Sequence, residues 1–210
     1  MYFMEALQYP FNSKGWISKA AIGVVLLIIP ILGWFTLSGY VVRIIREVMD
    51  GNQELPEYDY GADFSRGLMV FLFGLVYQIP AFIVSFILGA VMGRDGMAVA
   101  QLIASVLGFV VGLLLMVAMI RYALTEDSSV FWQFGENASL LTSNLGTVIS
   151  YFINALLFGL IGGIIVGIGF ALCVIPGLIL TPMLTFGSAY LIARFGQELN
   201  ISGGKAKNFA

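Results

Sequence analysis

The stretch GYVVRIIREVMDGNQELPEYDYGADFSRG, from Gly39 to Gly67, lies between two long apolar runs and is the longest polar passage of the chain. It holds six of the twelve acidic residues and three of the ten basic residues. A second polar passage covers residues 121–144. Long apolar runs that alternate with short charged passages predict helices that cross a membrane, joined by segments that stay in water.

The composition excludes several classes of protein. Of the 210 residues, 60% are apolar and 10% are charged, whereas soluble domains carry about 25% charged residues. A net charge of -2 and a pI near 5.0 leave no basic face for nucleic acid. With one Cys and no His, the usual zinc and copper sites and His-based catalysis are excluded. We therefore predict no catalytic residue, no cofactor, no metal site, and a protein that is not an enzyme.

The apolar runs predict an all-α, polytopic integral membrane protein with four or five spanning helices. Each run is long enough to cross a bilayer core of about 30 Å, the last one twice: residues 19–42, 67–92, 97–120 and 145–195. The segment 173–177 separates the last two crossings, and the polar turn 93–96 predicts an antiparallel pair around it. We expect one helical membrane domain, residues 1–195, with short interfacial amphipathic segments, and a polar tail at 196–210.

The first run contains Pro30 near its middle and Gly33 shortly after it. Proline kinks or breaks a helix, because it lacks the backbone N–H and its ring clashes with the preceding turn. The run therefore has two interpretations. We favour a kinked helix that crosses once, because about 24 residues suffice to span the core. The alternative is a re-entrant hairpin that turns at residues 30–33.

The second polar passage predicts a short amphipathic helix that lies flat in the membrane interface. Its apolar residues recur at helical spacing: Phe131, Phe134, Ala138 and Leu141. We expect Phe131, Phe134 and Leu141 to bury their side chains among acyl tails, with Asp127 or Ser128 as the cap. The alternative is an ordinary polar loop with scattered aromatic residues.

Aromatic and basic residues near the ends of the runs are predicted to anchor the protein at the membrane–water interface. These anchors are Trp16, Tyr40, Arg43, Arg121, Trp132, Tyr190 and Arg194. We also expect local ion pairs at i,i+4 spacing, Arg43 with Glu47 and Arg46 with Asp50. The remaining loop acids form a solvated face: Glu54, Glu57, Asp59 and Asp63.

The distribution of Lys and Arg predicts which side faces the cytoplasm, because cytoplasmic segments carry the excess of basic residues. One side carries most of them: Arg43, Arg46, Arg66, Arg121, Arg194, Lys205 and Lys207. Arg94 lies on the other side in both interpretations, and Lys14 and Lys19 join it only if the first run crosses. We therefore predict a multi-pass protein of the cytoplasmic membrane with residues 43–66, residues 121–144 and the C-terminus in the cytoplasm.

Between their boundary residues, the apolar runs contain no Asp, Glu, Lys, Arg or His. Proton relays and ion-coupled carriers place such groups inside the bilayer, so transport coupled in that way is not expected. The polar residues that remain should bond neighbouring helices rather than a substrate: Ser38, Gln78, Ser85, Ser105, Ser150, Asn154, Thr181 and Thr185. Three glycine pairs, Gly89/Gly93, Gly108/Gly112 and Gly163/Gly167, predict close packing within the chain, and the alternative is a homo-oligomer.

Several short motifs carry a resemblance to a known family. Gly15-Trp16, Gly39-Tyr40-x-x-Arg43, Leu55-Pro56-Glu57 and Tyr77-Gln78-Ile79-Pro80 resemble a prokaryotic membrane family catalogued as domain of unknown function 4013. The resemblance covers most of the chain, with its best motifs in the first eighty residues. It implies a multi-spanning inner-membrane protein and supplies no activity, substrate or functional residue.

The function that these observations favour is a non-enzymatic scaffold or bilayer-organising component. Membrane lipids are its expected partners, together with a protein partner at the cytoplasmic face. The candidate partner-binding loop is Leu55, Pro56, Glu57 and Tyr58, where the proline restricts the backbone and the tyrosine offers an amphipathic contact. The alternative is a passive permease or channel for a small or lipidic solute, which a continuous polar stripe on one helix would favour.

Overall fold

The computed structural model describes residues 2–92 and 97–201, and over these residues the secondary structure is helical. The elements are α1 (Phe3–Gln8), the 3-10 helix η1 (Tyr9–Phe11), α2 (Trp16–Ile28), α3 (Leu32–Met49), α4 (Tyr60–Met92), α5 (Met97–Thr125), the 3-10 helix η2 (Ser128–Trp132), α6 (Phe134–Thr142), α7 (Leu145–Leu172) and α8 (Val174–Glu198). Predictions on the turn 93–96, with Arg94 and Gly93, and on the tail beyond residue 201, with Lys205 and Lys207, lie outside the described residues.

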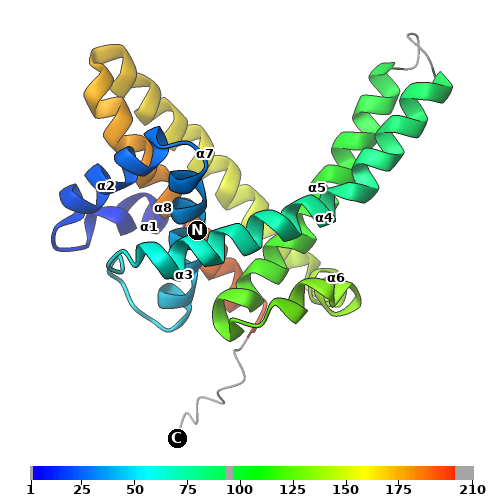
Figure 1. Cartoon of the computed structure of the whole chain (residues 1–210), viewed down its shortest axis with the longest axis horizontal. Coiled ribbons are helices and arrows are strands. Elements are labelled where there is room, and N and C mark those ends of the chain that lie inside the picture. The colour runs from blue at the N-terminus through cyan, green and yellow to red at the C-terminus, as the bar shows by residue number, and fades with distance from the viewer. Residues whose placement is uncertain (1, 93–96, 202–210) are drawn as a thin grey trace, which may run out of the picture.

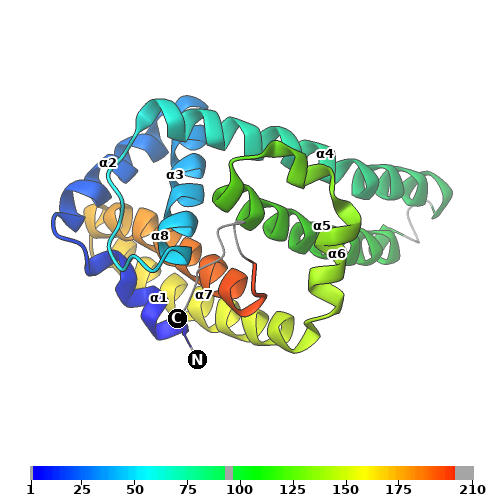
Figure 2. The same ribbon diagram turned by 90° about the horizontal axis from the view of Figure 1, so that it is seen from below.

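Four helices, α4, α5, α7 and α8, are long and apolar enough to cross a membrane. They form two hairpins, α4–α5 and α7–α8, which meet at one end of the molecule and diverge like the arms of a V (Figure 1). Seen from below, α6 links the base of α5 to the start of α7 (Figure 2). The prediction of a polytopic helical membrane protein is confirmed.

Helix α3 is the centre of the packed core, in contact with α2, α4, α5 and α8. Its residues Tyr40, Ile44 and Ile45 have no exposed surface. The backbones of α3 and α4 touch where Gly39 meets Gly67. A Cβ added at Gly67 would lie 1.8 Å from the carbonyl oxygen of Phe35, so this crossing accepts no side chain at either glycine.

The first apolar run is a helical hairpin, α2–α3, and the prediction of a kinked single span is wrong. Pro30 has no N–H to continue α2, and Ile31 turns the chain with φ 65° and ψ -72°. The N–H of Leu32 then donates to the carbonyl of Pro30 at 2.8 Å, which closes a γ-turn. The chain then runs back along α2: Tyr58 stacks on Tyr40, at the middle of α3, and its hydroxyl donates to the carbonyl of Lys19, near the start of α2. The re-entrant interpretation matches this geometry.

The second polar passage folds as η2 and α6 rather than as one helix, with a break at Gln133. Asp127 caps η2, since its side chain accepts from the N–H of Ser129 at 2.8 Å. Phe131 and Leu141 are buried in the protein, so the expectation that they insert among acyl tails is wrong for both. Phe131 stacks on Phe73 with ring centroids 4.3 Å apart. Among the aromatic residues of this passage, Trp132 and Phe134 are exposed.

Two of the predicted glycine pairs, Gly108/Gly112 and Gly163/Gly167, do not pack within the described part of the chain, and Gly93 of the third pair lies outside it. A Cβ at Gly108, Gly112, Gly163 or Gly167 would meet no atom within 4 Å. Close approach between α7 and α8 occurs instead at other glycines, including Gly162, Gly169 and Gly177. The alternative, a contact between copies of the chain, stays a prediction.

Polar groups inside the runs mostly bond their own helix. Ser85, Ser105, Thr181 and Thr185 each donate to the carbonyl four residues earlier, so their expected bonds to neighbouring helices are not seen. Asn154 does bond another element: its Oδ1 accepts from the N–H groups of Tyr2 and Phe3, at 2.9 and 3.1 Å. These bonds hold α1 against α7.

Candidate functional site

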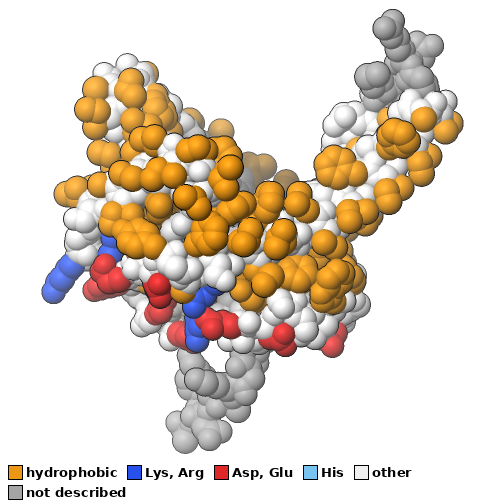
Figure 3. Space-filling view, in the orientation of Figure 1, with side chains coloured by type: hydrophobic (Ala, Val, Ile, Leu, Met, Phe, Trp, Pro, Cys, Tyr) orange, Lys and Arg blue, Asp and Glu red, His pale blue; other side chains and the backbone are white. Residues whose placement is uncertain are grey.

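Charged side chains gather along one edge of the molecule, below the apolar surface, in the view of Figure 3. The ion-paired residues that define this charged face are Lys19, Arg43, Arg46, Glu57, Asp59, Asp63, Arg66, Arg121, Glu126 and Glu136. They come from α2, α3, α4, α5, α6, the loop before α4 and the segment after α5. Because charged groups avoid the hydrocarbon core, we infer that this face lies outside the core, in contact with water.

Residues 55–58 form a strap across the start of α2 and the middle of α3. Leu55 is buried; its N–H donates to the Ser13 hydroxyl, and its carbonyl accepts from Lys19 Nζ at 2.5 Å. The next carbonyl, that of Pro56, accepts from the Tyr40 hydroxyl at 2.7 Å. The strap therefore fastens the start of α2 to the middle of α3.

The second half of the strap continues these contacts. Tyr58 stacks on Tyr40 with ring centroids 3.9 Å apart, and its hydroxyl donates to the carbonyl of Lys19 at 3.2 Å. Burial raises the pKa of the Tyr58 hydroxyl above its ordinary value, so the hydroxyl stays a donor. Glu57 is exposed and lies 3.0 Å from Lys19 Nζ. The fold thus packs Leu55 and Tyr58 inside the chain and leaves Glu57 accessible, while partner binding by this loop stays a prediction.

Six charged side chains form a continuous chain of ion pairs below α3, α4 and α5. Their order is Asp59, Arg43, Asp63, Arg66, Glu126 and Arg46, with successive N···O separations of 3.7, 2.7, 3.5, 2.6 and 2.7 Å. The predicted local pairs of Arg43 with Glu47 and of Arg46 with Asp50 are therefore wrong. The fold brings α4 and α5 against α3, and carboxylates on α4, just before α4 and just after α5 take the place of the neighbours along α3.

Asp63 is the buried centre of this ion-pair chain, with no exposed surface. Its Oδ1 accepts from Arg43 Nε at 2.9 Å, and its Oδ2 accepts from the N–H of Asp59 at 3.0 Å. The prediction of a solvated carboxylate is wrong here, whereas Glu54, Glu57 and Asp59 are exposed as predicted. Removing one partner of a buried ion pair typically costs about 3–5 kcal/mol, so Asp63 has a structural role.

The predicted interfacial anchors divide into two groups. Tyr40 and Tyr190 lie inside the protein rather than at the lipid boundary, and the Tyr190 hydroxyl donates to Glu5 at 2.8 Å. The arginines bond protein groups: Arg43 as described, Arg121 with Gln133, Glu136 and Asn137, and Arg194 with Gln197. Trp132 is exposed and Trp16 is partly buried, as an interfacial residue would be.

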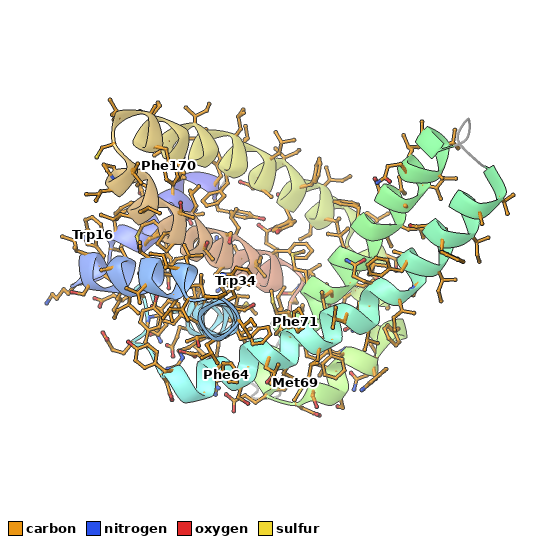
Figure 4. All side chains as sticks on the ribbon, turned by 45° about the horizontal axis from the view of Figure 1, so that its top comes forward. Trp16, Trp34, Phe64, Met69, Phe71 and Phe170 are labelled. Carbon is orange, nitrogen blue, oxygen red and sulfur yellow. The ribbon has the colours of Figure 1, made fainter. Side chains whose placement is uncertain are left out.

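The turn between α2 and α3, at the opposite end of the hairpin from the strap, is apolar and exposed. Ile28, Ile31 and Leu32 each expose more than 60% of their surface. Trp34, labelled on α3 in Figure 4, donates its indole N–H to the carbonyl of Leu27 at 3.1 Å. This bond satisfies a carbonyl at the broken end of α2, as a hydrocarbon environment requires.

A polar cavity of about 290 Å³ opens beside the ion-pair chain. Its lining includes three arginines and three carboxylates: Arg43, Arg46, Arg66, Glu47, Asp50 and Asp59. Glu126 bonds two of these arginines, and those bonds hold the pKa of its carboxyl below the ordinary value. The charges suit binding of an ionic group. Within the described part of the chain, no three His, Cys, Asp or Glu side chains are placed to hold a metal ion.

Sequence reasoning did not identify Glu126, Arg66 or Asp63 as partners. Glu126 and Arg66 are 60 residues apart along the chain, and no motif links them. The sequence did show that charged residues concentrate at the start of α4 and at the end of α5. An antiparallel pair of helices places these two ends side by side, so ion pairs between them could have been expected.

Comparisons with known proteins identify a family and no closer relative. A family model described as "Protein of unknown function (DUF4013)" matches residues 22–175. No curated protein and no solved structure matches the chain.

Proposed function

The chain belongs to the DUF4013 family of proteins of unknown function, whose description assigns no role, and we propose that it is a non-enzymatic membrane scaffold that organises the bilayer through a hairpin inserted into one leaflet. The observation that carries this proposal is the α2–α3 hairpin. The strap of residues 55–58 holds it at the charged face, and its exposed turn is apolar. We place the charged face, with residues 43–66 and 121–144, in the cytoplasm, because it holds five of the seven Lys and Arg residues in the described part of the chain.

The dimensions of the hairpin support insertion into a single leaflet. Helix α2 has 13 residues, or about 20 Å of helix, whereas the hydrocarbon core is about 30 Å thick. Fully burying a large aliphatic side chain contributes about 1.5–3 kcal/mol. The exposed turn residues Ile28, Ile31 and Leu32 therefore favour a position among acyl chains by several kcal/mol in total.

The elements beside the hairpin increase the area that the protein occupies in the same leaflet. The η2–α6 segment lies at the base of the molecule and α1 lies beside α8, whereas the arms α4–α5 and α7–α8 diverge away from the base (Figure 1). A body with a larger cross-section in one leaflet expands that leaflet relative to the other, and insertion of this kind is sensitive to curvature. We expect the protein to prefer membranes in which the charged face is on the convex side.

The test is the distribution of labelled protein between a flat vesicle wall and a membrane nanotube drawn from it. The protein should be enriched on nanotubes that have the charged face outward. A double variant, Ile31→Asp with Leu32→Asp, changes only exposed turn residues and adds about 2.5–3.5 kcal/mol per charge at membrane depth, so it should lose the enrichment. The matched control, Ile31→Val with Leu32→Val, should keep it.

The same liposomes separate the scaffold from a passive permease. Rapid, saturable efflux of a small solute, together with equal protein densities on flat and curved membrane, would contradict the proposal and favour transport. Size-exclusion profiles of the variants in detergent establish that each protein remains folded.

A further inference from the structure

The polar cavity below α3, α4 and α5 has a feature that the scaffold proposal does not use. Two guanidinium groups converge on a single oxygen: Arg46 Nη1 and Arg66 Nη2 donate to Glu126 Oε1 at 2.7 and 2.6 Å. Paired guanidiniums are the usual protein ligands of phosphate and carboxylate groups, because their N–H donors match the geometry of an oxyanion. The carboxylate of Glu126 therefore occupies an oxyanion position supplied by this chain.

Glu126 is held in that position by its side-chain bonds rather than by burial. Its side chain is 48% exposed, so water and solutes reach it. Its backbone has φ 57°, in the left-handed region that residues other than glycine adopt only at a cost in free energy. An external oxyanion can thus replace the Glu126 carboxylate without opening the core.

The cavity lining also holds acidic residues. Glu47, Asp50 and Asp59 line the same cavity as Arg46 and Arg66. These carboxylates repel a second negative charge, and they attract a cation at short range. A small ligand that matches both kinds of charge carries an oxyanion and an ammonium group.

We propose that this cavity binds a phosphate-bearing zwitterion of the phosphoethanolamine type. Its phosphate takes the place of the Glu126 carboxylate on Arg46 and Arg66, and its ammonium group lies beside Asp50. The ligand chemistry has two sources, the headgroup of a lipid and a free solute. The inference stands on the cavity alone, so it is independent of hairpin insertion.

The experiment is a calorimetric titration of the detergent-solubilised full chain with free phosphoethanolamine. Glu126→Gln removes the competing charge and keeps the side-chain shape, so it should bind about tenfold more tightly than the unmodified protein, a difference of about 1.4 kcal/mol. Arg46→Gln, at an exposed position of α3, should lose binding. Asp50→Asn should weaken phosphoethanolamine and leave inorganic phosphate unchanged, which separates ammonium recognition from simple anion attraction.

Two results would overturn the proposal: no heat of binding to Glu126→Gln at millimolar phosphoethanolamine, or equal affinity in Glu126→Gln and in Glu126→Gln with Arg46→Gln. Size-exclusion chromatography of each variant shows that loss of binding is not loss of folding. Nanodiscs then distinguish the sources. A phosphatidylethanolamine disc that blocks the free ligand assigns the site to a lipid headgroup, and one that does not block it, relative to a phosphatidylglycerol disc, assigns the site to a solute.

Discussion

Replacing Gly67 by alanine tests the contact on which the whole core depends, the crossing of α3 and α4. A Cβ at this position would lie 1.8 Å from the carbonyl oxygen of Phe35, and real Cβ atoms essentially never come within 3.0 Å of a neighbour. The obstacle is backbone, which cannot rotate away. The two helices must therefore separate by about 1.2 Å, the difference between these two distances.

The cost of that separation follows from two losses. Overpacking in a well-packed core typically costs about 1–3 kcal/mol. The movement also stretches the ion pair of Arg43 with Asp63, now 2.7 Å long, and leaves Asp63 less well paired in a buried position. We expect Gly67→Ala to lower the free energy of unfolding by about 3 kcal/mol, at the upper end of the packing range.

Gly108→Ala is the matched control, because Gly108 also lies inside a long helix but a Cβ there would meet nothing within 4 Å. Alanine is the better helix former by about 0.5–1 kcal/mol, so this variant should be as stable as the unmodified protein or slightly more so. The assay is reversible unfolding in mixed micelles, followed by far-UV circular dichroism. Equal stability of the two alanine variants would refute the described crossing.

Three further predictions concern the charged face and the second polar passage. Asp63→Asn should lower the free energy of unfolding by about 3–5 kcal/mol, because Arg43 and Arg66 then keep only the exposed carboxylates of Asp59 and Glu126 as ion-pair partners. Asp59→Asn, at an exposed position, should cost about 0–1 kcal/mol; the same micelle unfolding measures both. Phe131→Ala should cost about 3–5 kcal/mol as a buried aromatic, and Trp132→Ala should stay within about 0.5 kcal/mol in detergent, so similar losses would contradict the assigned faces. The pKa of the Glu126 carboxyl is lowered below its ordinary value of 4.5, so its ion pairs stabilise the fold above pH 4.5 and are lost as the pH falls through the lowered pKa. The stability difference between the unmodified protein and Glu126→Gln should therefore shrink as the pH falls through that range. A difference independent of pH would contradict the pairing.

The membrane class and the long helices could be predicted from the sequence because they depend on local composition. Apolar runs of sufficient length must form helices in hydrocarbon, where each backbone group has to be satisfied within its own segment. The break between α7 and α8 falls at Cys173, inside the predicted segment. That class of inference needs no knowledge of which helices touch.

The course of the first run could not be predicted from its own residues. Pro30 indicates that the helix is interrupted but does not decide between a kink and a turn, since either conformation can accommodate the backbone hydrogen bond that proline cannot donate. What distinguishes them is tertiary: Lys19 reaches Leu55 and Glu57, and Gly33 packs against the backbone of Leu26. The run is long enough to cross the hydrocarbon core once, but the length argument that favoured a single crossing did not account for these contacts.

The charged residues show the same limit. Spacing along α3 indicated Glu47 as the partner of Arg43, yet the fold supplies Asp63, whose carboxylate is buried and accepts several bonds. Likewise, Tyr40 has the composition of an interfacial anchor but lies in the core under the strap. A residue type with both apolar and polar parts suits either environment, so its place depends on neighbours distant in the sequence.

The measurement that tests the account most directly is the sidedness of three single cysteines in a Cys173→Ala background. Lys14→Cys precedes the hairpin, Glu54→Cys follows it, and Val91→Cys lies at the far end of α4; all three positions are exposed. An impermeant thiol reagent is applied to sealed vesicles of opposite orientation. We predict that Lys14→Cys and Glu54→Cys react from the same side and Val91→Cys from the other. Labelling of Lys14→Cys together with Val91→Cys would show that the first run crosses the membrane, and would contradict the hairpin.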